Sequence, residues 1–210
     1  MDRKGKIILA TLELASAKGL KAVSMSQIAE KVGIKAPSLY NHFRSKDEII
    51  KAMYGFLREK AQKKPSPVFA EQNDSKSLQE ILTEAVSAYQ GMIEDQNMTQ
   101  FFRVLYSERS LSPLGAEIMV EETEHMIQAT KNLFYGLAVH GKMKSEDVDT
   151  AALTFALTVH ALINYRMDRI TAGVSDPSGN DESLCTKQMM DFIRWFSMQA
   201  GGENHEQKAH

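Results

Sequence analysis

The sequence predicts an all-α fold, and three observations support this prediction. Apolar residues recur at intervals of three and four residues along most of the chain, which is the spacing of an amphipathic helix. Capping pairs precede several of these segments, and glycine or proline follows them, as expected at helix ends. No segment is typical of a strand.

Composition and charge narrow the class of protein. A hydrophobic content of 43% is enough for a buried core, and no apolar run is long enough to span a bilayer. The single cysteine, Cys185, excludes an intrachain disulfide and is typical of a reducing compartment. We therefore expect a soluble cytoplasmic protein with no membrane partner, and we expect Cys185 to be a core residue rather than a thiol sensor.

Charge is distributed unevenly along the chain. Residues 1–64 contain 14 Lys and Arg against 6 Asp and Glu, a net charge of +8, whereas the rest of the chain carries −10. Because a polyanion attracts only the first segment, this asymmetry indicates that residues 1–64 meet nucleic acid. The alternative is a chance clustering of solvated charges.

The first elements follow from their capping signals. We predict one helix over residues 3–18, and we expect Gly19 to close it in the left-handed conformation. Ser24 and Gln27 have the spacing of a capping box, so a short second helix begins directly after Ser24. Gly33 ends this helix, since glycine adopts a positive φ at low cost.

A third helix follows a tight turn, with a polar outer face. Pro37 suits its first turn, and Leu39 and Phe43, four residues apart, are expected to form its buried face. Ser45 and Glu48 form a second capping box, which starts a longer fourth helix. Two short helices around a glycine turn, the second with a polar outer face, describe a helix-turn-helix.

The details of this segment resemble a known family. The series Ile28-Ala29, Gly33, Ser38-Leu39-Tyr40, His42-Phe43 and Lys46 in one register resembles the N-terminal domain of the TetR family of bacterial transcriptional regulators. The resemblance covers roughly residues 6 to 53. A generic helical hairpin would share the glycine turn but not this series.

The resemblance implies a DNA-binding surface. Asn41 and Lys35 are the expected base readers, because Asn can pair with adenine and Lys can reach guanine. Ala36 leaves at most a methyl contact with thymine. The implied contacts are Ser26, Tyr40, His42 and Lys46 to phosphates, Ser26 and Lys46 at helix N-termini, and Lys35, Ala36, Ser38 and Asn41 on the DNA-facing side of the recognition helix.

The rest of the chain predicts further helices and no internal repeat. The fourth helix runs from Lys46 to about Lys64, where prolines end it, and the polar run 71–77 is the expected domain boundary. Later helices are predicted from Ser77 to Glu94, Met98 to Tyr106, Ser112 to His140, Ser145 to Ala172 and Glu182 to Ala200. The predicted domains are residues 1–50, with a linking helix over 46–64, then residues 65–200 and a disordered tail over 201–210.

The resemblance implies that the second domain binds a ligand and forms the dimer. His160 and Asn164 lie one turn apart on an apolar helix, so they either line a pocket or form a satisfied core pair. The 12 methionines suit an apolar or aromatic effector, although such residues also build an ordinary core. The expected pocket residues are Phe56, Tyr89, Met92, Phe102, Tyr106, Met126, His160 and Asn164.

Motifs of other functions fail in detail. Residues 136–142, GLAVHGK, nearly match a phosphate-binding P-loop but follow a helix and precede Met143 rather than Ser or Thr. His205, Glu206 and His210 miss the spacing of a zinc protease. We expect no enzyme, no cofactor and no metal site.

The resulting prediction is a transcriptional regulator. By resemblance it is a homodimer, paired through its last two long helices, that binds a palindromic double-stranded DNA operator. The resemblance also implies repression, relieved by a small-molecule effector. The alternative is a helical small-molecule-binding protein or an enzyme with a vestigial helix-turn-helix. The intact Tyr40, His42 and Lys46 and the +8 segment argue against that alternative.

Overall fold

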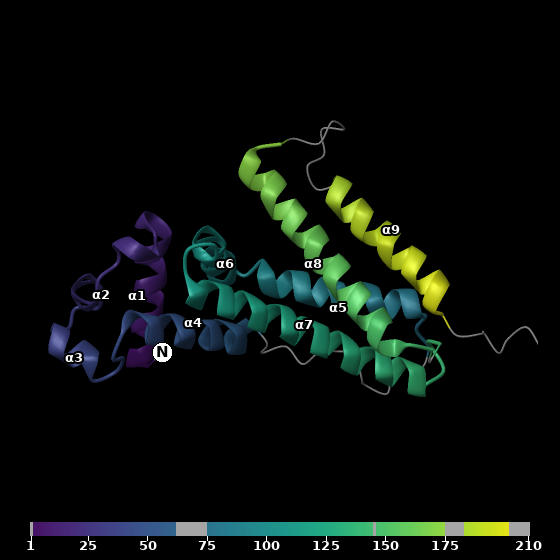
Figure 1. Ribbon diagram of the computed structural model, residues 1–210, viewed down its shortest axis with the longest axis horizontal. Coiled ribbons are helices and arrows are strands. Elements are labelled where there is room, and N and C mark those ends of the chain that lie inside the picture. Colours follow the sequence, from purple (N-terminus) through teal and green to yellow (C-terminus); the bar gives the residue numbers. More distant parts are fainter. Residues whose placement is uncertain (1, 62–74, 145, 175–182, 202–210) are drawn as a thin grey trace, which may run out of the picture. The chain divides into compact units, whose positions relative to one another are not determined.

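The computed structural model describes residues 2–61, 75–144, 146–174 and 183–201. Within these ranges the chain is helical and forms no strand, apart from one isolated bridge between Met143 and Gly201. The predicted all-α class is therefore confirmed. Figure 1 labels the elements, which are α1 (Arg3–Lys18), η1 (Leu20–Ala22), α2 (Met25–Val32), α3 (Ala36–Tyr40), α4 (Lys46–Ala61), α5 (Leu78–Ile93), α6 (Gln96–Glu108), α7 (Pro113–Val139), α8 (Val148–Ala172) and α9 (Ser183–Ala200).

The helices are divided between two compact units. Unit 1 is drawn from residues 1–65 and 91–121, and unit 2 from residues 66–90 and 122–210, so that α5 and α7 contribute to both. α6 packs against α1 and α4 within unit 1. These packing units therefore group residues 91–121 with the N-terminal helices, whereas the domain boundary predicted from the sequence lies before residue 78.

The ends of α2 follow the predicted signals. The Ser24 hydroxyl accepts from the Gln27 N–H at 3.3 Å, and the Gln27 side-chain oxygen accepts from the Ser24 N–H at 3.0 Å. Gly33 follows α2 with a φ of +74° and a ψ of 36°, the left-handed conformation predicted for it. Gly19 differs from the prediction: its φ is +80° but its ψ is 152°, because the chain leaves α1 extended to enter η1.

The predicted third helix is too long. α3 ends at Tyr40, so Phe43 lies beyond it, although Phe43 is buried and its N–H donates to the Leu39 carbonyl at 3.0 Å. Asn41 is the C-cap of α3, and the His42 N–H donates to the Leu39 carbonyl three residues earlier rather than continuing the α-helical pattern. Ser45 then caps α4, where its hydroxyl accepts from the Glu48 N–H at 3.1 Å. The Glu48 carboxylate accepts from the Arg44 N–H at 2.6 Å, one residue before the predicted partner.

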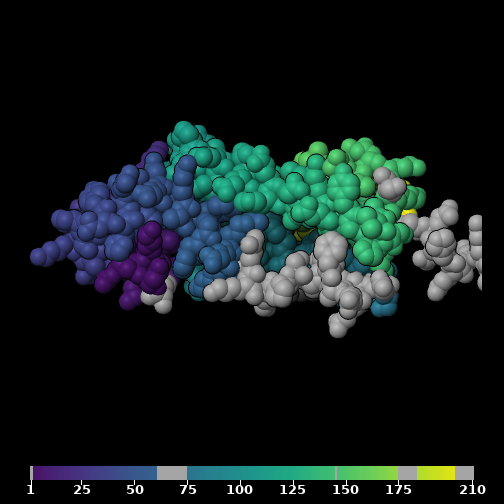
Figure 2. Space-filling model, turned by 90° about the horizontal axis from the view of Figure 1, so that it is seen from below, coloured from purple at the N-terminus to yellow at the C-terminus, as the bar shows by residue number. Residues whose placement is uncertain are grey.

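The core of unit 1 forms where the apolar faces of its helices meet. The rings of Tyr54 on α4 and Phe101 on α6 stack with their centroids 6.3 Å apart. In the space-filling view, the first residues of α1 lie at the surface beside α4 (Figure 2). Core side chains that are at most 1% exposed are Ile7, Leu12, Ile28, Leu39, Ile49, Leu57, Met98, Phe101 and Leu105.

Unit 2 is built on α7, α8 and α9 with the start of α5. α9 runs alongside α8 (Figure 1), and their contact is aromatic: the rings of Phe155 and Phe196 meet edge to face at 4.9 Å, and Phe134 on α7 lies 5.5 Å from both. α8 begins at Val148, later than predicted, because Asp147 is its cap and accepts from the Thr150 N–H at 3.1 Å.

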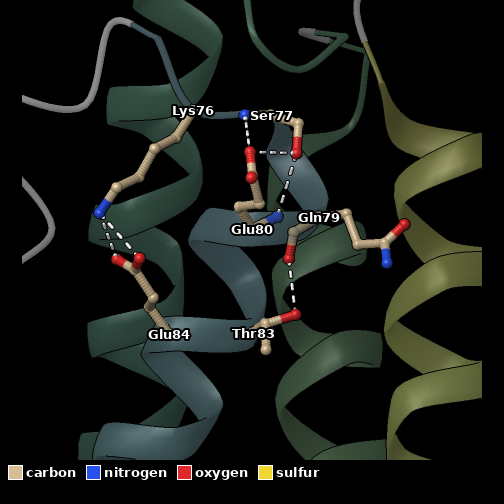
Figure 3. Close-up of polar contacts among 6 residues, drawn as sticks. All are labelled: Lys76, Ser77, Gln79, Glu80, Thr83 and Glu84. Carbon is tan, nitrogen blue, oxygen red and sulfur yellow. Dashed lines mark hydrogen bonds and ion pairs between the residues drawn. The ribbon is translucent and has the colours of Figure 1, made fainter.

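Ser77 and Glu80 cap the start of α5 (Figure 3). The Glu80 carboxylate accepts from the Ser77 N–H at 2.7 Å, and the Glu80 N–H donates to the Ser77 hydroxyl at 3.3 Å. Lys76 pairs with Glu84 at 2.7 Å. The P-loop-like segment ends α7, as predicted, and its Lys142 ammonium donates to the Lys76 carbonyl at 2.7 Å.

Several predictions lie outside the described residues. They are the end of the fourth helix at residues 62–64, the polar run over residues 71–74, Ser145, the first residue of the last predicted helix, and the tail over residues 202–210.

Candidate nucleic-acid interface

The predicted DNA-contacting residues lie on and around the outer side of α3. Leu39 is fully buried and fixes α3 to the core of unit 1. Tyr40, the next residue, is 51% exposed, and Asn41 and Lys35 are also exposed. Because α3 has one buried side, it presents the polar residues predicted for base and phosphate contact to solvent. Ala36, Ser38 and His42 are half-buried at its margins.

The first turn of α2 supplies another predicted phosphate position. Ser26 is exposed there, next to the capping box that satisfies the Ser24 and Gln27 N–H groups. Helix N-termini favour anions because their first N–H groups have no partner within the helix. The capping box holds this end of α2 in shape, and the phosphate contact of Ser26 stays a prediction.

Lys46 is placed in a way that the sequence did not reveal. It is the first residue of α4, and its ammonium donates to the Leu20 carbonyl at 2.7 Å and to the Val23 carbonyl at 3.0 Å. Its side chain is half-buried, directed toward the segment between α1 and α2. The predicted phosphate contact of Lys46 through its backbone N–H at the start of α4 is compatible with this arrangement.

Charge pairing reduces the positive potential of unit 1 at some positions. Lys31 at the end of α2 pairs with Glu13 on α1 at 2.6 Å, and Lys51 on α4 pairs with Glu117 on α7 at 3.1 Å. Both pairs are solvent-exposed, so each contributes only about 0–1 kcal/mol to stability. The Lys4 ammonium lies 5.7 Å from the centre of the Phe43 ring.

The predicted effector residues are shared between the two units. Phe56, Met92, Phe102 and Tyr106 belong to unit 1. Tyr89, Met126, His160 and Asn164 belong to unit 2. Phe102 and Met126 are buried, and the other six are half-buried. Their common pocket stays a prediction.

Sequence reasoning missed a buried charged residue in unit 2. Glu122 on α7 is 1% exposed, the one charged side chain in the buried set of the described residues, and it accepts from the Tyr89 hydroxyl of α5 at 3.2 Å. The available signal was its position between Met119 and Met126, three and four residues away, on the apolar stripe of α7. A charged residue on such a stripe indicates a partner in the interior.

Other kinds of site receive little support within the described ranges. No group of three or more His, Cys, Asp or Glu side chains there could hold a metal ion. No described helix is long and apolar enough to cross a membrane. Cys185 is buried in α9, as predicted for a core residue.

Comparisons with known proteins agree with this geometry. A family model described as bacterial regulatory proteins of the TetR family matches residues 7–53, the segment from α1 into α4. A second model, described as the C-terminal domain of AefR-like transcriptional repressors, matches residues 80–194, more than half of the 210 residues.

A curated relative matches a short part of the chain. The HTH-type transcriptional activator FasR of Mycolicibacterium smegmatis is 36% identical over 52 residues, which are 25% of this chain and 24% of that protein. The match therefore spans about a quarter of the relative's length.

Solved structures match over nearly the whole chain. A TetR-family transcriptional regulator from Mesorhizobium loti MAFF303099 has a TM-score of 0.72 and 18% identity, covering 96% of this chain and 100% of that chain. The flavonoid-responsive regulator FrrA has a TM-score of 0.72 and 21% identity, covering 96% of this chain and 98% of that chain. At these identities the likeness shows the fold. Together with the two family models, it shows that this chain belongs to the TetR family of DNA-binding transcriptional regulators.

Proposed function

We propose that this chain is a repressor, acting in the cytoplasm, that binds a palindromic operator as a homodimer and is released by a small-molecule effector. The observation that supports the proposal most directly is the burial of Leu39 on α3 together with the exposure of Tyr40 and Asn41. Ser26 on α2 is exposed as well. The repressor role is supported by the description of the family model over residues 80–194. The relative FasR is an activator, so the direction of regulation needs its own test.

The proposed DNA contacts divide into positioning and base recognition. Tyr40, His42, Ser26 and the backbone of Lys46 would hold phosphates, which orient the domain without reading sequence. Lys35 and Asn41 would reach base edges in the major groove. Ala36 and Ser38 complete the DNA-facing side of α3.

An exposed apolar surface on α8 and α9 supports the homodimer. Leu153 and Leu157 on α8 are 42% and 43% exposed, one helical turn apart. Trp195 and Met198 on α9 are 52% and 66% exposed. Removal of such a surface from water is the main favourable contribution to association, and a second copy of the same two helices would form a four-helix bundle.

The proposed effector is apolar or aromatic, and the predicted set supplies the candidate residues for its binding. It can release the operator only if it binds the DNA-free arrangement more tightly than the DNA-bound one. Glu122 and Tyr89 add a polar pair to the interior of unit 2, which would favour an effector carrying a hydrogen-bond donor.

The first test is binding of the purified chain to DNA from around its own gene, across a salt series. We expect a sequence-specific complex whose affinity falls steeply with salt, because phosphate contacts release counterions. The double variant Tyr40→Ala, His42→Ala should weaken operator binding at least roughly tenfold and leave folding intact, since Tyr40 is exposed and His42 is half-buried.

An enzyme with a vestigial helix-turn-helix would behave differently. It would bind no DNA sequence preferentially, in this region or in a genome-wide selection of bound fragments, and the double variant would change nothing. That result would contradict the proposed function. A promoter reporter also separates repression from activation. When the double variant replaces wild type, expression of the reporter should rise if the protein is a repressor and fall if it is an activator.

A further inference from the structure

The inference concerns the side chain of Lys46. Its ammonium donates two hydrogen bonds, to the Leu20 and Val23 carbonyls, which precede it in the chain by 26 and 23 residues. A lysine that serves only as a phosphate contact would extend into solvent. Here the half-buried side chain is directed at the chain segment between α1 and α2.

The two carbonyls flank η1, because Leu20 is its first residue and Val23 follows its last. Val23 closes this short helix, and its own N–H donates to the Leu20 carbonyl at 3.3 Å. The Leu20 carbonyl thus already accepts one hydrogen bond, and the Lys46 ammonium adds a charge-assisted bond to it and another to the Val23 carbonyl. Lys46 therefore fixes the backbone immediately before Ser24, the residue that caps α2.

We propose that Lys46 is a positioning residue for DNA binding, whose ammonium holds the start of α2 against the start of α4. The two helix N-termini joined in this way are the two proposed to bind phosphates, at Ser26 and at the Lys46 backbone. α3 follows α2 through Gly33, so the orientation of α2 also sets that of the recognition helix. This inference rests on the proposed DNA contacts of the same surface.

Three substitutions in the full-length protein test the proposal. Lys46→Met removes the ammonium and keeps an unbranched apolar stem. Lys46→Arg keeps the charge and the donors. Lys21→Met is the matched control, because Lys21 is an exposed lysine of η1 itself, so the same charge is lost from the same region without loss of the two bonds. Each variant is titrated with operator and with a scrambled duplex across a salt series.

We expect Lys46→Met to weaken operator binding by roughly tenfold or more, as for loss of hydrogen bonds to a charged group, without a change in the salt slope. Binding to the scrambled duplex should fall no further than it does in Lys21→Met, because a misplaced α2 impairs specific binding more than general attraction. Lys46→Arg should recover part of the operator affinity.

Two results of these titrations would overturn the proposal. One is a fall of the salt slope by about one, with equal losses on operator and scrambled duplex, which identifies the ammonium as a phosphate contact. The other is an operator affinity of Lys46→Met equal to that of Lys21→Met.

A second variant covers the case in which Lys46→Met does not fold. A second measurement distinguishes failure of this proposal from failure of the proposed function. If Lys46→Met does not fold, Lys46→Gln, which is shorter and neutral, replaces it with the same two deciding outcomes. Amide hydrogen exchange in Met25–Val32 should be faster in the variant than in wild type, and it is measured without DNA. Failure of wild type to bind any operator contradicts the proposed function, whereas unchanged exchange contradicts the role of Lys46.

Discussion

At the scale of single residues, Gly33 is a position where backbone conformation alone decides the choice of amino acid. Its φ of +74° lies in the left-handed region, and a Cβ placed there would meet no atom within 4 Å. A substitution therefore adds no clash, and its cost comes from the backbone. The same glycine turns the chain from α2 into α3, so this cost affects the element that carries the proposed DNA contacts.

We predict that Gly33→Ala lowers the free energy of unfolding by about 1–2 kcal/mol, because an L-residue with a Cβ is disfavoured in the left-handed conformation. Gly33→Asn should cost less, since asparagine adopts this conformation more readily. Urea unfolding of both variants measures the difference. Equal stability of the two variants and wild type would show that the turn does not require the left-handed conformation in solution.

The buried Glu122 shows at this scale how an interior charge depends on its partners. The Tyr89 hydroxyl donates to its carboxylate at 3.2 Å, and no buried side-chain polar atom of the described residues lacks a hydrogen-bond partner. Hydrogen bonding of this kind offsets the cost of removing the Glu122 carboxylate from water.

At the scale of elements, the cap at the start of α5 makes a contribution to stability that depends on pH. The Ser77 N–H, and then the Ser77 hydroxyl, hold the pKa of Glu80 below its ordinary value of 4.5. A carboxylate with a lowered pKa in the folded state stabilises the fold above its unfolded pKa. That contribution is lost as the pH falls through the folded pKa. The neighbouring Lys76 and Lys142 act on Glu80 in the same direction.

We predict that the stability advantage of wild type over Glu80→Gln is present at neutral pH and shrinks as the pH falls below about 4.5. Ser77→Ala should remove only part of this pH dependence, because the Ser77 N–H remains. Thermal unfolding of the three proteins from pH 7 to pH 3 makes the comparison. A gap between wild type and Glu80→Gln that is constant with pH would exclude the cap as its source.

At the scale of the whole molecule, the chain combines two compact units whose functions differ in the proposal. Unit 1 contains the helix-turn-helix, and unit 2 contains α8, α9 and their exposed apolar residues. Palindromic operators require two recognition helices, so dimerisation in unit 2 would determine the affinity of unit 1 for DNA.

We predict that Leu157→Lys converts a dimer into a monomer, because it places a charge in the proposed interface. The matched control is Val139→Lys at the end of α7, since Val139 is 83% exposed and lies outside α8 and α9. Sedimentation velocity gives the oligomeric state, and operator titration gives the loss of affinity. A Leu157→Lys protein that stays dimeric would place the interface elsewhere, and a monomeric wild type would contradict the homodimer.

The sequence by itself determined the features that depend on neighbours along the chain. The capping box at Ser24, the left-handed Gly33, the start of α7 after Ser112 and its end within residues 136–142 all follow from residues within one or two turns. The resemblance to the TetR family was equally local, because its residues lie in one continuous segment. These features are predictable since hydrogen bonding within a turn limits the conformations that each residue can adopt.

Only the tertiary structure decided which distant groups meet. It directs the Lys46 ammonium to carbonyls more than 20 residues away, buries Glu122 beside Tyr89, and packs residues 91–121 with the N-terminal helices. The proposed effector pocket and dimer interface cannot be derived from the sequence for the same reason. A helical pattern shows which face of a helix is apolar, but the apolar face has no preferred partner until all the helices pack together.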